Sequence, residues 1–447
     1  MSEKNRLSVD PRFDRLLVRK HTSSVRYLVV DVKAPTSPEN KCDKLPPLNL
    51  GVIIDASASM DQHDRGDVNG LDISRLDAAK NASEGIIKNL KEQDALSLTS
   101  FSDDAIAHFS SANMNNDEQR RACSIVREVS TRSVTDLYNG WMEGAEQVAL
   151  KQENRADQIN RLLILTDGHA NRGITDPDEL AKIAADLRER GIITSAVGIG
   201  EDYSTEQIEP LSEYGGGMLH HANNPSDIIE IVLSEILDMR ASVIEDLKIN
   251  VSLENTRFAE TVKIEPIGLV SHENQVIIGN LVGDANKSAV FRIHIPKGCE
   301  ERLEFNITAM WKDSEGKKSA AYTSELSPAD DDAVFTEVWN QEVCSEAANI
   351  WQADIIQQAL KFNKLGDARS ARRFAVQQKS FFGHYTRRLD NGKQLFEQLE
   401  QALHRMARPM REINRKEIHM NLRRRRHGEL DRRISSPPSE WSEYLQD

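Results

Sequence analysis

The chain has 447 residues, of which 29% are charged and 39% are apolar, and its formal net charge is −14. No stretch approaches the roughly eighteen uninterrupted apolar residues of a spanning helix, which excludes that class of membrane protein. The polar N-terminal residues lack the apolar run of a secretory signal, so we expect a soluble, cytoplasmic protein. The acidic balance argues against a general affinity for nucleic acid.

The length suggests about three domains. The cysteines lie far apart and form no C-x-x-C pair: Cys42, Cys123, Cys299 and Cys344. This spacing excludes a zinc knuckle and a disulfide framework, and it fits a reducing compartment.

Residues 1–45 are expected to contribute strands and then a linker. Strand-like runs at 15–19 and 25–32 lie on either side of a short polar stretch. A segment rich in Pro, Ser and Asn follows at 34–47 and is typical of a linker.

From residue 46 to residue 240, apolar strands alternate with amphipathic helices. Strands are predicted at 48–54, 95–101, 161–165 and 192–199, and helices near 75–90, 137–151, 177–190 and 225–240. This alternation predicts a mainly parallel sheet with helices on both faces. In such a sheet, ligands bind beyond the carboxyl ends of the strands.

Three short segments place oxygen-bearing side chains near those strand ends. Asp55, Ser57 and Ser59 form a D-x-S-x-S pattern directly after the first apolar strand. Thr135 lies just ahead of the second helix, and Asp167 follows the third strand and precedes a glycine. A D-x-S-x-S match alone is a weak signal, but the three segments together are hard to attribute to chance.

In this order and spacing, the segments resemble the metal-ion-dependent adhesion site of von Willebrand factor type A domains. The resemblance covers about residues 46–240 and implies a doubly wound, Rossmann-like α/β fold. It also implies a metal site made of Asp55, Ser57, Ser59, Thr135 and Asp167. The flanking segments resemble those of bacterial and archaeal intracellular members more than those of animal adhesion proteins.

The chemistry of this set fits Mg²⁺, with Mn²⁺ as the second choice. Three neutral hydroxyls and two carboxylates suit a hard cation that demands octahedral geometry. The set contains no His or Cys, which disfavours zinc and redox metals. Because only two carboxylates contribute charge, the ion would remain electrophilic at an open position, where a carboxylate of a partner can bind.

The resemblance therefore implies a binding protein rather than an enzyme. We expect the ion to capture an acidic side chain of a partner protein, with the chain acting as an adaptor or scaffold in a stress, defence or ATPase-linked assembly. In the family, such contact can shift the last helix of the domain, expected here at 225–240. That helix leads straight into the following strands.

Enzyme motifs are missing from the sequence. It has no P-loop, no G-x-S-x-G elbow and no H-E-x-x-H, and neither Ser57 nor Ser59 has a nearby His as base. A hydrolase in which the ion activates water stays an alternative. It needs a further base, which the unusually long loop at 60–74 would have to supply. We favour a solvated, partner-specific role for that loop over a second ion site.

Two other conspicuous features of this segment have structural interpretations. His220 and His221 are adjacent, so on a strand they point to opposite faces and cannot both bind one ion. We expect them on an edge strand. Trp141 lies at helical spacing among apolar residues and is expected to pack in the core.

Residues 241–327 return to short alternating strands. They are expected at 247–253, 275–281, 289–295 and 303–311. This pattern predicts an antiparallel β-sandwich. We further expect the N-terminal strands to join it, which would make the α/β domain an insertion within a β domain.

Residues 328–433 are predicted to be helical and basic. A turn is expected at 363–367, with a glycine ending one helix and an aspartate capping the next. Residues 361–433 carry a net charge of +12, which leaves −26 on the rest of the chain. The cluster Arg423–Arg426 suggests an RNA-associated scaffold as an alternative function, or a contact with the acidic body of the chain.

Residues 434–447 resemble a flexible tail that ends in a short linear motif. Trp441, Tyr444 and Leu445 would share one helical face. A disordered end is the competing interpretation.

Overall fold

The computed structural model describes residues 6–36, 46–63, 73–152, 158–168, 170–200, 203–222, 242–254, 256–269, 271–272, 274–313 and 315–406, and then 408, 410, 414, 415, 418 and 422. Two compact units result: Pro38–Ser242 is unit 2, and Met1–Ser37 with Val243–Asp447 is unit 1. The helix expected at 225–240, the cluster Arg423–Arg426, the tail and most of the loop at 60–74 lie outside the described residues. No helix within the described ranges is both long and apolar enough to cross a membrane.

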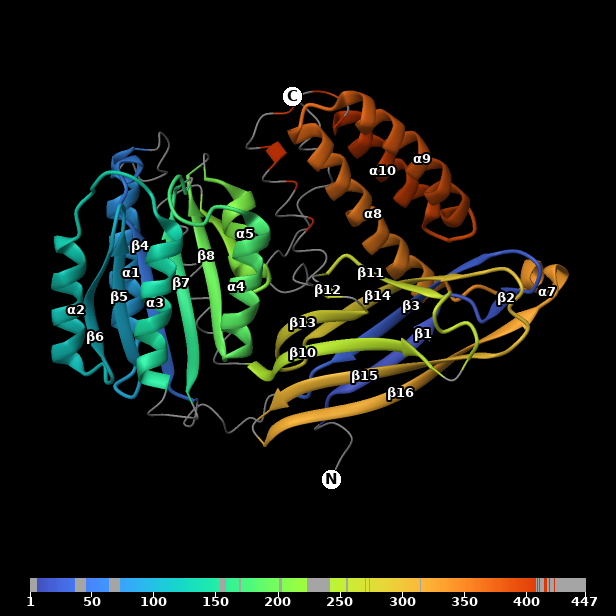
Figure 1. Ribbon diagram of the computed structural model, residues 1–447, viewed down its shortest axis with the longest axis horizontal. Helices are drawn as coiled ribbons and strands as arrows, with labels where there is room; N and C mark the ends of the chain where they lie inside the picture. The colour runs from blue at the N-terminus through green and yellow to red at the C-terminus, as the bar shows by residue number, and fades with distance from the viewer. Residues whose placement is uncertain are drawn as a thin grey trace. The chain divides into compact units, whose positions relative to one another are not determined.

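Unit 2 is a six-stranded sheet with helices on both faces (Figure 1). Its strands are β4 (Leu48–Asp55), β5 (Ala95–Phe101), β6 (Ala105–Ser111), β7 (Ile159–Thr166), β8 (Ile192–Ile199) and β9 (Gly216–Ala222). Its helices are the short η3 (Ala58–Asp61), α1 (Arg75–Asn89), α2 (Asn116–Glu128), α3 (Leu137–Gln152), α4 (Pro177–Glu189) and α5 (Thr205–Glu213). The strand order is β6-β5-β4-β7-β8-β9, and every pair is parallel except β5 with β6. The predicted α/β fold is therefore confirmed.

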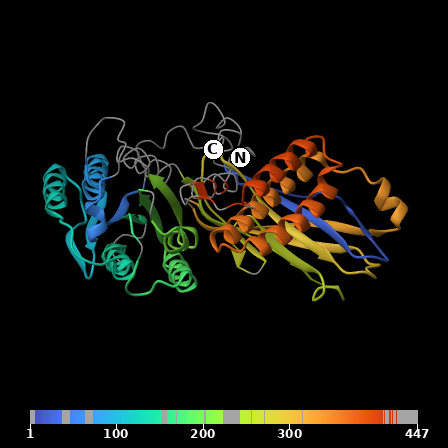
Figure 2. The ribbon, with the colours of Figure 1, turned by 90° about the horizontal axis from the view of Figure 1, so that it is seen from above.

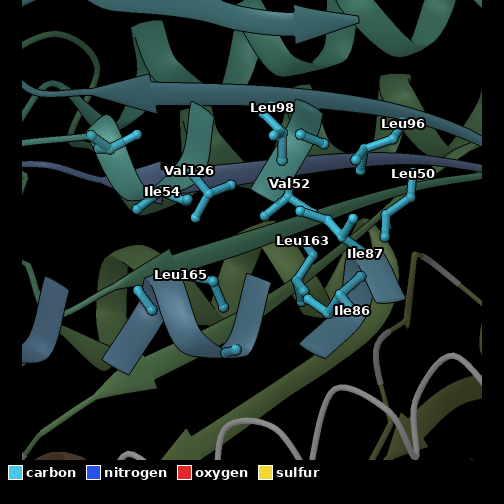
Figure 3. Packing of buried hydrophobic residues seen from close by; sticks show 14 of the residues in the cluster. Leu50, Val52, Ile54, Ile86, Ile87, Leu96, Leu98, Val126, Leu163 and Leu165 are labelled. Carbon is cyan, nitrogen blue, oxygen red and sulfur yellow. The ribbon is translucent and has the colours of Figure 1, made fainter. Parts of the chain in front are cut away.

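Alternate residues of β4 enter two different layers of unit 2. Leu50, Val52 and Ile54 pack with α1 and α2 in a core that is closed to water (Figure 3). Gly51 and Ile53 face α3 instead. Because both faces of the central strands are covered, every residue of β4, β5 and β7 is buried and most of them are apolar, as is typical of buried parallel strands.

Helix α3 approaches the sheet closely because glycines lie at its contact positions. A Cβ added at Gly140 would lie 2.4 Å from Phe101 Cβ, and one added at Gly144 would lie 2.5 Å from Ile53 Cδ1. Real Cβ atoms do not approach other atoms this closely. These two glycines therefore set the distance between α3 and the sheet.

Replacing Gly140 with alanine is expected to destabilise unit 2 by about 2 kcal/mol, because the added methyl overlaps the side chain of Phe101. The sign is informative, since helix propensity alone would favour alanine by about 1 kcal/mol. Urea denaturation followed by circular dichroism measures the change. Asn139→Ala, at an exposed position of the same helix, is the matched control. A stabilised Gly140→Ala variant would contradict the close packing.

Unit 1 contains a β-sandwich. One sheet has the order β1-β3-β14-β11, and the other has the order β12-β13-β10-β15-β16-β2. The strands are β1 (Ser8–Phe13), β2 (Leu17–Arg19), β3 (Ser24–Lys33), β10 (Ser242–Leu253), β11 (Lys263–Ile267), β12 (Ser271–His272), β13 (Gln275–Val282), β14 (Asn286–Ile295), β15 (Leu303–Asp313) and β16 (Gly316–Ala329). The pairs β1–β3, β3–β14, β14–β11, β12–β13, β10–β15 and β15–β16 are antiparallel, and β16 with β2 is parallel.

Strands from both sides of unit 2 in the sequence meet in one sheet. β3 pairs with β14 along its whole length, from Ser24 opposite Ile295 to Lys33 opposite Asn286. Leu28 and Val30 of β3 enter the core between the two sheets, together with Phe291 of β14. The pairing of β3 with β14 makes unit 2 an insertion in the chain of unit 1.

The opposite face of the first sheet is covered by helices (Figures 1 and 2). The covering helices are α8 (Gln341–Lys364), α9 (Ala368–Thr386) and α10 (Gly392–Met406), whereas the short α7 (Asp331–Thr336) lies beside β2. Tyr27 and Val29 of β3 pack in the helical core, whereas their neighbours Leu28 and Val30 point the other way. The sandwich and the helices thus share β3.

The turn between α8 and α9 has the predicted chemistry. Gly366 has a φ of 69°, which is the left-handed conformation that a glycine adopts readily after a helix. Asp367 is the N-cap of α9, and its side chain accepts a hydrogen bond of 3.0 Å from the Ser370 N–H.

A buried carboxylate ties the first strands to the helices. Asp14 is 1% exposed, and its side chain accepts hydrogen bonds from the Tyr27 N–H at 2.9 Å and the Tyr385 hydroxyl at 3.1 Å. Arg15 supplies a positive charge, with its Nε at 3.3 Å from Asp14 Oδ2. This one side chain therefore links β3, the segment after β1, and α9.

Candidate metal centre

The candidate centre lies at the carboxyl ends of the neighbouring strands β4 and β7. Asp55 is the last residue of β4 and is fully buried. Its Oδ1 accepts a hydrogen bond of 2.8 Å from the Ser57 N–H, and its Oδ2 accepts one of 2.6 Å from the Thr166 hydroxyl. Burial raises the pKa of Asp55 to about 6, although these hydrogen bonds oppose the rise.

The two serines connect Asp55 to the second aspartate. Ser57 precedes η3 as its N-cap, and Ser59 lies within that short helix. The hydroxyl oxygens of Ser57 and Ser59 are 3.0 Å apart, and the Ser59 hydroxyl donates to Asp167 Oδ1 at 2.8 Å. Asp167 follows directly after β7. The structure therefore brings Ser57, Ser59 and Asp167 into one hydrogen-bonded chain beside Asp55.

Arg75, the first residue of α1, occupies the other side of Asp167. Its Nη1 lies 2.8 Å from Asp167 Oδ2, and both side chains are almost completely buried. The two carboxylates of the centre thus differ. Asp167 has a guanidinium partner, whereas Asp55 forms no ion pair within the described part of the chain.

Thr135 belongs to a loop that is fastened to both neighbouring strand ends. The Ala58 N–H donates to the Ser133 carbonyl at 3.2 Å, and the Asp136 N–H donates to the Ser102 carbonyl at 2.7 Å. Thr135 itself is bonded through its backbone N–H to Asn171 Oδ1 at 3.2 Å. Its hydroxyl has no hydrogen-bond partner among the described residues.

Gly168 locates Thr135 relative to Asp55. A Cβ added at Gly168 would lie 2.9 Å from Asp55 Oδ2, 3.1 Å from Thr135 Cγ2 and 3.2 Å from Thr166 Oγ1. The three side chains, including the methyl group of Thr135, therefore lie close around Gly168 and leave too little room for a Cβ there.

The donor set fits a hard divalent cation. The side chains of Ser57, Ser59 and Asp167 are joined by hydrogen bonds, Asp55 accepts one from the Ser57 backbone N–H, and Thr135 lies close to Asp55. Over the described ranges, no group of three or more His, Cys, Asp or Glu side chains is arranged to hold a metal. Such groups do not include a centre made of two carboxylates and three hydroxyls, because Ser and Thr are not among those residue types. The five-ligand metal site stays a prediction.

The structure also shows where the residues with structural interpretations lie. Trp141 is fully buried on α3, and its Nε1–H donates to Thr194 Oγ1 at 3.1 Å. His220 and His221 lie on β9, the edge strand of the sheet. Both predictions are confirmed, and none of these three residues belongs to the centre.

Comparison with known proteins identifies the fold around this centre. The description of the matching family is von Willebrand factor type A domain, and the match covers residues 49–233. Residues 49–233 form a von Willebrand factor type A domain. Below, they are called the type A domain.

Two relatives carry sequence similarity. The chain is 28% identical over 224 residues to the uncharacterized protein YfbK of Escherichia coli strain K12, a match that covers 49% of this chain and 36% of the relative. It is 23% identical over 268 residues to the uncharacterized protein sll0103 of Synechocystis, which covers 57% of this chain and 58% of the relative. The matches thus leave a large part of each relative uncovered.

Two solved structures share the fold over most of this chain. The ArnB paralog VWA2 from Sulfolobus acidocaldarius matches with a TM-score of 0.57 and 16% identity, covering 94% of this chain and 99% of that one. A von Willebrand factor type A protein from Catenulispora acidiphila matches with a TM-score of 0.61 and 15% identity, covering 89% and 88%. Because these matches extend well beyond the type A domain, the likeness includes the fold of unit 1.

The contacts that three residues make at the centre were not predicted from the sequence. Thr166 and Gly168 flank the predicted Asp167, and their position at a strand end was the available signal. No sequence pattern pointed to Arg75. The long loop before α1 makes it impossible to tell from the sequence which residue of that helix contacts Asp167.

Proposed function

We propose that the type A domain binds Mg²⁺ and uses the ion to capture an acidic side chain of a protein partner. The proposed ligands are Asp55, Ser57, Ser59, Thr135 and Asp167. Type A domains generally mediate metal-dependent protein–protein interaction. The observation that carries the proposal is the buried Asp55 carboxylate, which faces oxygen-bearing side chains and has no cationic partner among the described residues.

A buried carboxylate without a counter-charge is unfavourable, and a bound dication would compensate it. The other carboxylate supports the same conclusion. Asp167 already forms an ion pair with Arg75, so the two carboxylates would neutralise the charge of a dication only in part. The ion would then supply an electrophilic position for a further carboxylate. Mn²⁺, with the same preference for oxygen, would be the second choice.

This function is that of an adaptor or scaffold protein and not of an enzyme. In support of a binding role, backbone and hydroxyl hydrogen bonds join Asp55, Ser57, Ser59 and Asp167, four of the proposed ligands. A stress, defence or ATPase-linked assembly is the setting that we propose for the chain.

The test is affinity capture with the intact chain and with Asp55→Ala, each in Mg²⁺ and in EDTA. We expect a set of partner proteins that is retained by the intact chain in Mg²⁺ and lost in the other three arms. Mass spectrometry identifies the partners, and the intact chain returned from EDTA to Mn²⁺ should recover them.

Asp117→Ala is the matched control, because Asp117 is an exposed carboxylate at the start of α2, outside both the ligand set and the loop at 60–74. It should capture the same partners as the intact chain. Partners that stay bound in EDTA and to Asp55→Ala would leave the metal without a recruiting role and overturn the proposal.

A further inference from the structure

β16 has an open edge within the sandwich. It follows β15 in the sheet, and its other neighbour, β2, pairs only with Ser327–Ala329. Within the described part of the chain, residues 316–326 therefore pair with a strand on one side only, although β1 of the other sheet packs near β16. An edge of this length exposes backbone donors and acceptors that can pair with another strand.

The other edges of the sandwich are interrupted. β1 contains Pro11 and β11 contains Pro266, and a proline cannot donate to a neighbouring strand. β12 has only two residues. In β16, by contrast, the open segment contains no proline, and its register with β15 runs without a bulge from Gly316 to Leu326. Natural sandwiches block edges that are not meant to pair.

The contact with β2 shows which peptide groups face the open edge. The Ser327 N–H donates to the Leu16 carbonyl, and the Ala329 carbonyl accepts from the Lys20 N–H. Backbone groups alternate along a strand, so the odd-numbered residues before Ser327 point in the same direction. The even-numbered residues bond to β15. The outward set is 317, 319, 321, 323 and 325, and its centre is Ala321.

We propose that two copies of this chain pair antiparallel along β16, with Ala321 on the twofold axis, and so form one continuous sheet. This register opposes Lys317 to Glu325 of the second copy, and Ser319 to Thr323. Each pair occurs twice, as an isologous interface requires. Residue 316 then lies opposite residue 326, so the pairing uses the whole open segment and ends where β2 begins.

Charge selects a second copy as the occupant. The side chains of Lys317, Ser319, Ala321, Thr323 and Glu325 are all exposed and lie on one face of the sheet. Opposite charges directly across a strand pair are stabilising, and like charges are destabilising. Lys317 has no ion-pair partner among the described residues, and Glu325 contacts only Arg302, at 2.9 Å on the exposed surface. The central segment Ser319–Ser324 is uncharged.

The first test uses the full chain in analytical ultracentrifugation. The intact chain should be a dimer in reversible exchange with monomer. Ala321→Pro removes an outward N–H and no bond to β15, so it should give a monomer with an unchanged circular dichroism spectrum. Lys317→Glu should weaken the dimer about tenfold, because two like-charge pairs replace two opposite pairs. The double variant Lys317→Glu/Glu325→Lys should restore it.

The second test fixes the register. In a Cys42→Ser background, Ala321→Cys places two thiols directly across the axis, where Cα atoms of a hydrogen-bonded pair are about 5.5 Å apart and a disulfide can form. Oxidation should convert most of the protein into disulfide-linked dimers. Ala320→Cys should not cross-link, because its neighbour across the interface is Tyr322.

Three outcomes overturn the proposal. They are an intact chain that stays monomeric at high micromolar concentration, a dimer that survives Ala321→Pro, and cross-linking through residue 320 in preference to residue 321. None of these measurements depends on a bound metal.

Discussion

Replacing Asp55 with alanine is expected to abolish Mg²⁺ binding by the type A domain. The change removes one of two carboxylates and the anchor of the loop that carries Ser57. Loss of an outer-shell partner alone typically costs 10–100-fold in metal affinity, so loss of a ligand should cost about a hundredfold or more. Isothermal titration with MgCl₂ measures the loss directly.

A second measurement separates metal loss from misfolding. Mg²⁺ should raise the melting temperature of the intact chain, because it binds only the folded state, and should leave that of Asp55→Ala unchanged. Asp117→Ala, at an exposed position of α2, should respond like the intact chain. If Asp55→Ala binds Mg²⁺ with unaltered affinity, Asp55 is not a ligand and the proposed centre is wrong.

Replacing Asp14 with alanine should destabilise unit 1 by about 3–5 kcal/mol. The variant leaves the Tyr27 N–H and the Tyr385 hydroxyl without their acceptor, and it leaves Arg15 without its counter-charge. Urea denaturation should show the transition of unit 1 at a lower midpoint. Hydrogen exchange should show earlier exposure of β3 and α9, and the Tyr27 amide should lose protection first.

Asp10→Ala is the matched control for this prediction. Asp10 lies on β1 with its side chain largely in solvent, where it pairs with Arg12. Exposed pairs contribute about 0–1 kcal/mol, so the control should change stability little. If both variants lost the same free energy of unfolding, the buried, hydrogen-bonded Asp14 would stabilise the protein no more than an exposed carboxylate does, and the prediction would be wrong.

The parallel strands of the type A domain were predictable because burial on both faces removes polar residues from them. The runs expected at 48–54, 95–101 and 192–199 match β4, β5 and β8 to within a residue. The first apolar run was less informative. A strand was expected at 15–19, but β2 begins at Leu17 and the longer β1 lies earlier, at Ser8–Phe13, where Asp10 and Pro11 hide it.

Elements with few buried side chains were missed. β6 has one buried residue, Phe109, and α2 buries only three side chains along its length. β16 alternates exposed and half-buried positions and contains mostly small or polar residues. In each case, neighbouring strands and helices decide the conformation, and the apolar pattern that sequence analysis relies on is too weak.

At the centre, the residues at strand ends could be predicted from the sequence, whereas Arg75, at the start of a helix, could not. Asp55 and Asp167 were placed beyond the carboxyl ends of β4 and β7, and the structure shows both there. Arg75 reaches Asp167 only because α1 begins beside the centre after a long loop. No local pattern encodes a contact between residues 92 positions apart.

The pairing of β3 with β14 has a consequence for the order in which the chain folds. The ribosome makes about 250 residues between these strands, which takes roughly 13–50 seconds at ordinary rates of synthesis. Leu28 and Val30 cannot pack against Phe291 until that residue has been synthesised. Every strand of the type A domain, by contrast, is complete once Ala222 has been added. The nascent inserted domain can therefore close first, while β3 has only β1 as a partner and its apolar face stays exposed to aggregation or chaperone binding.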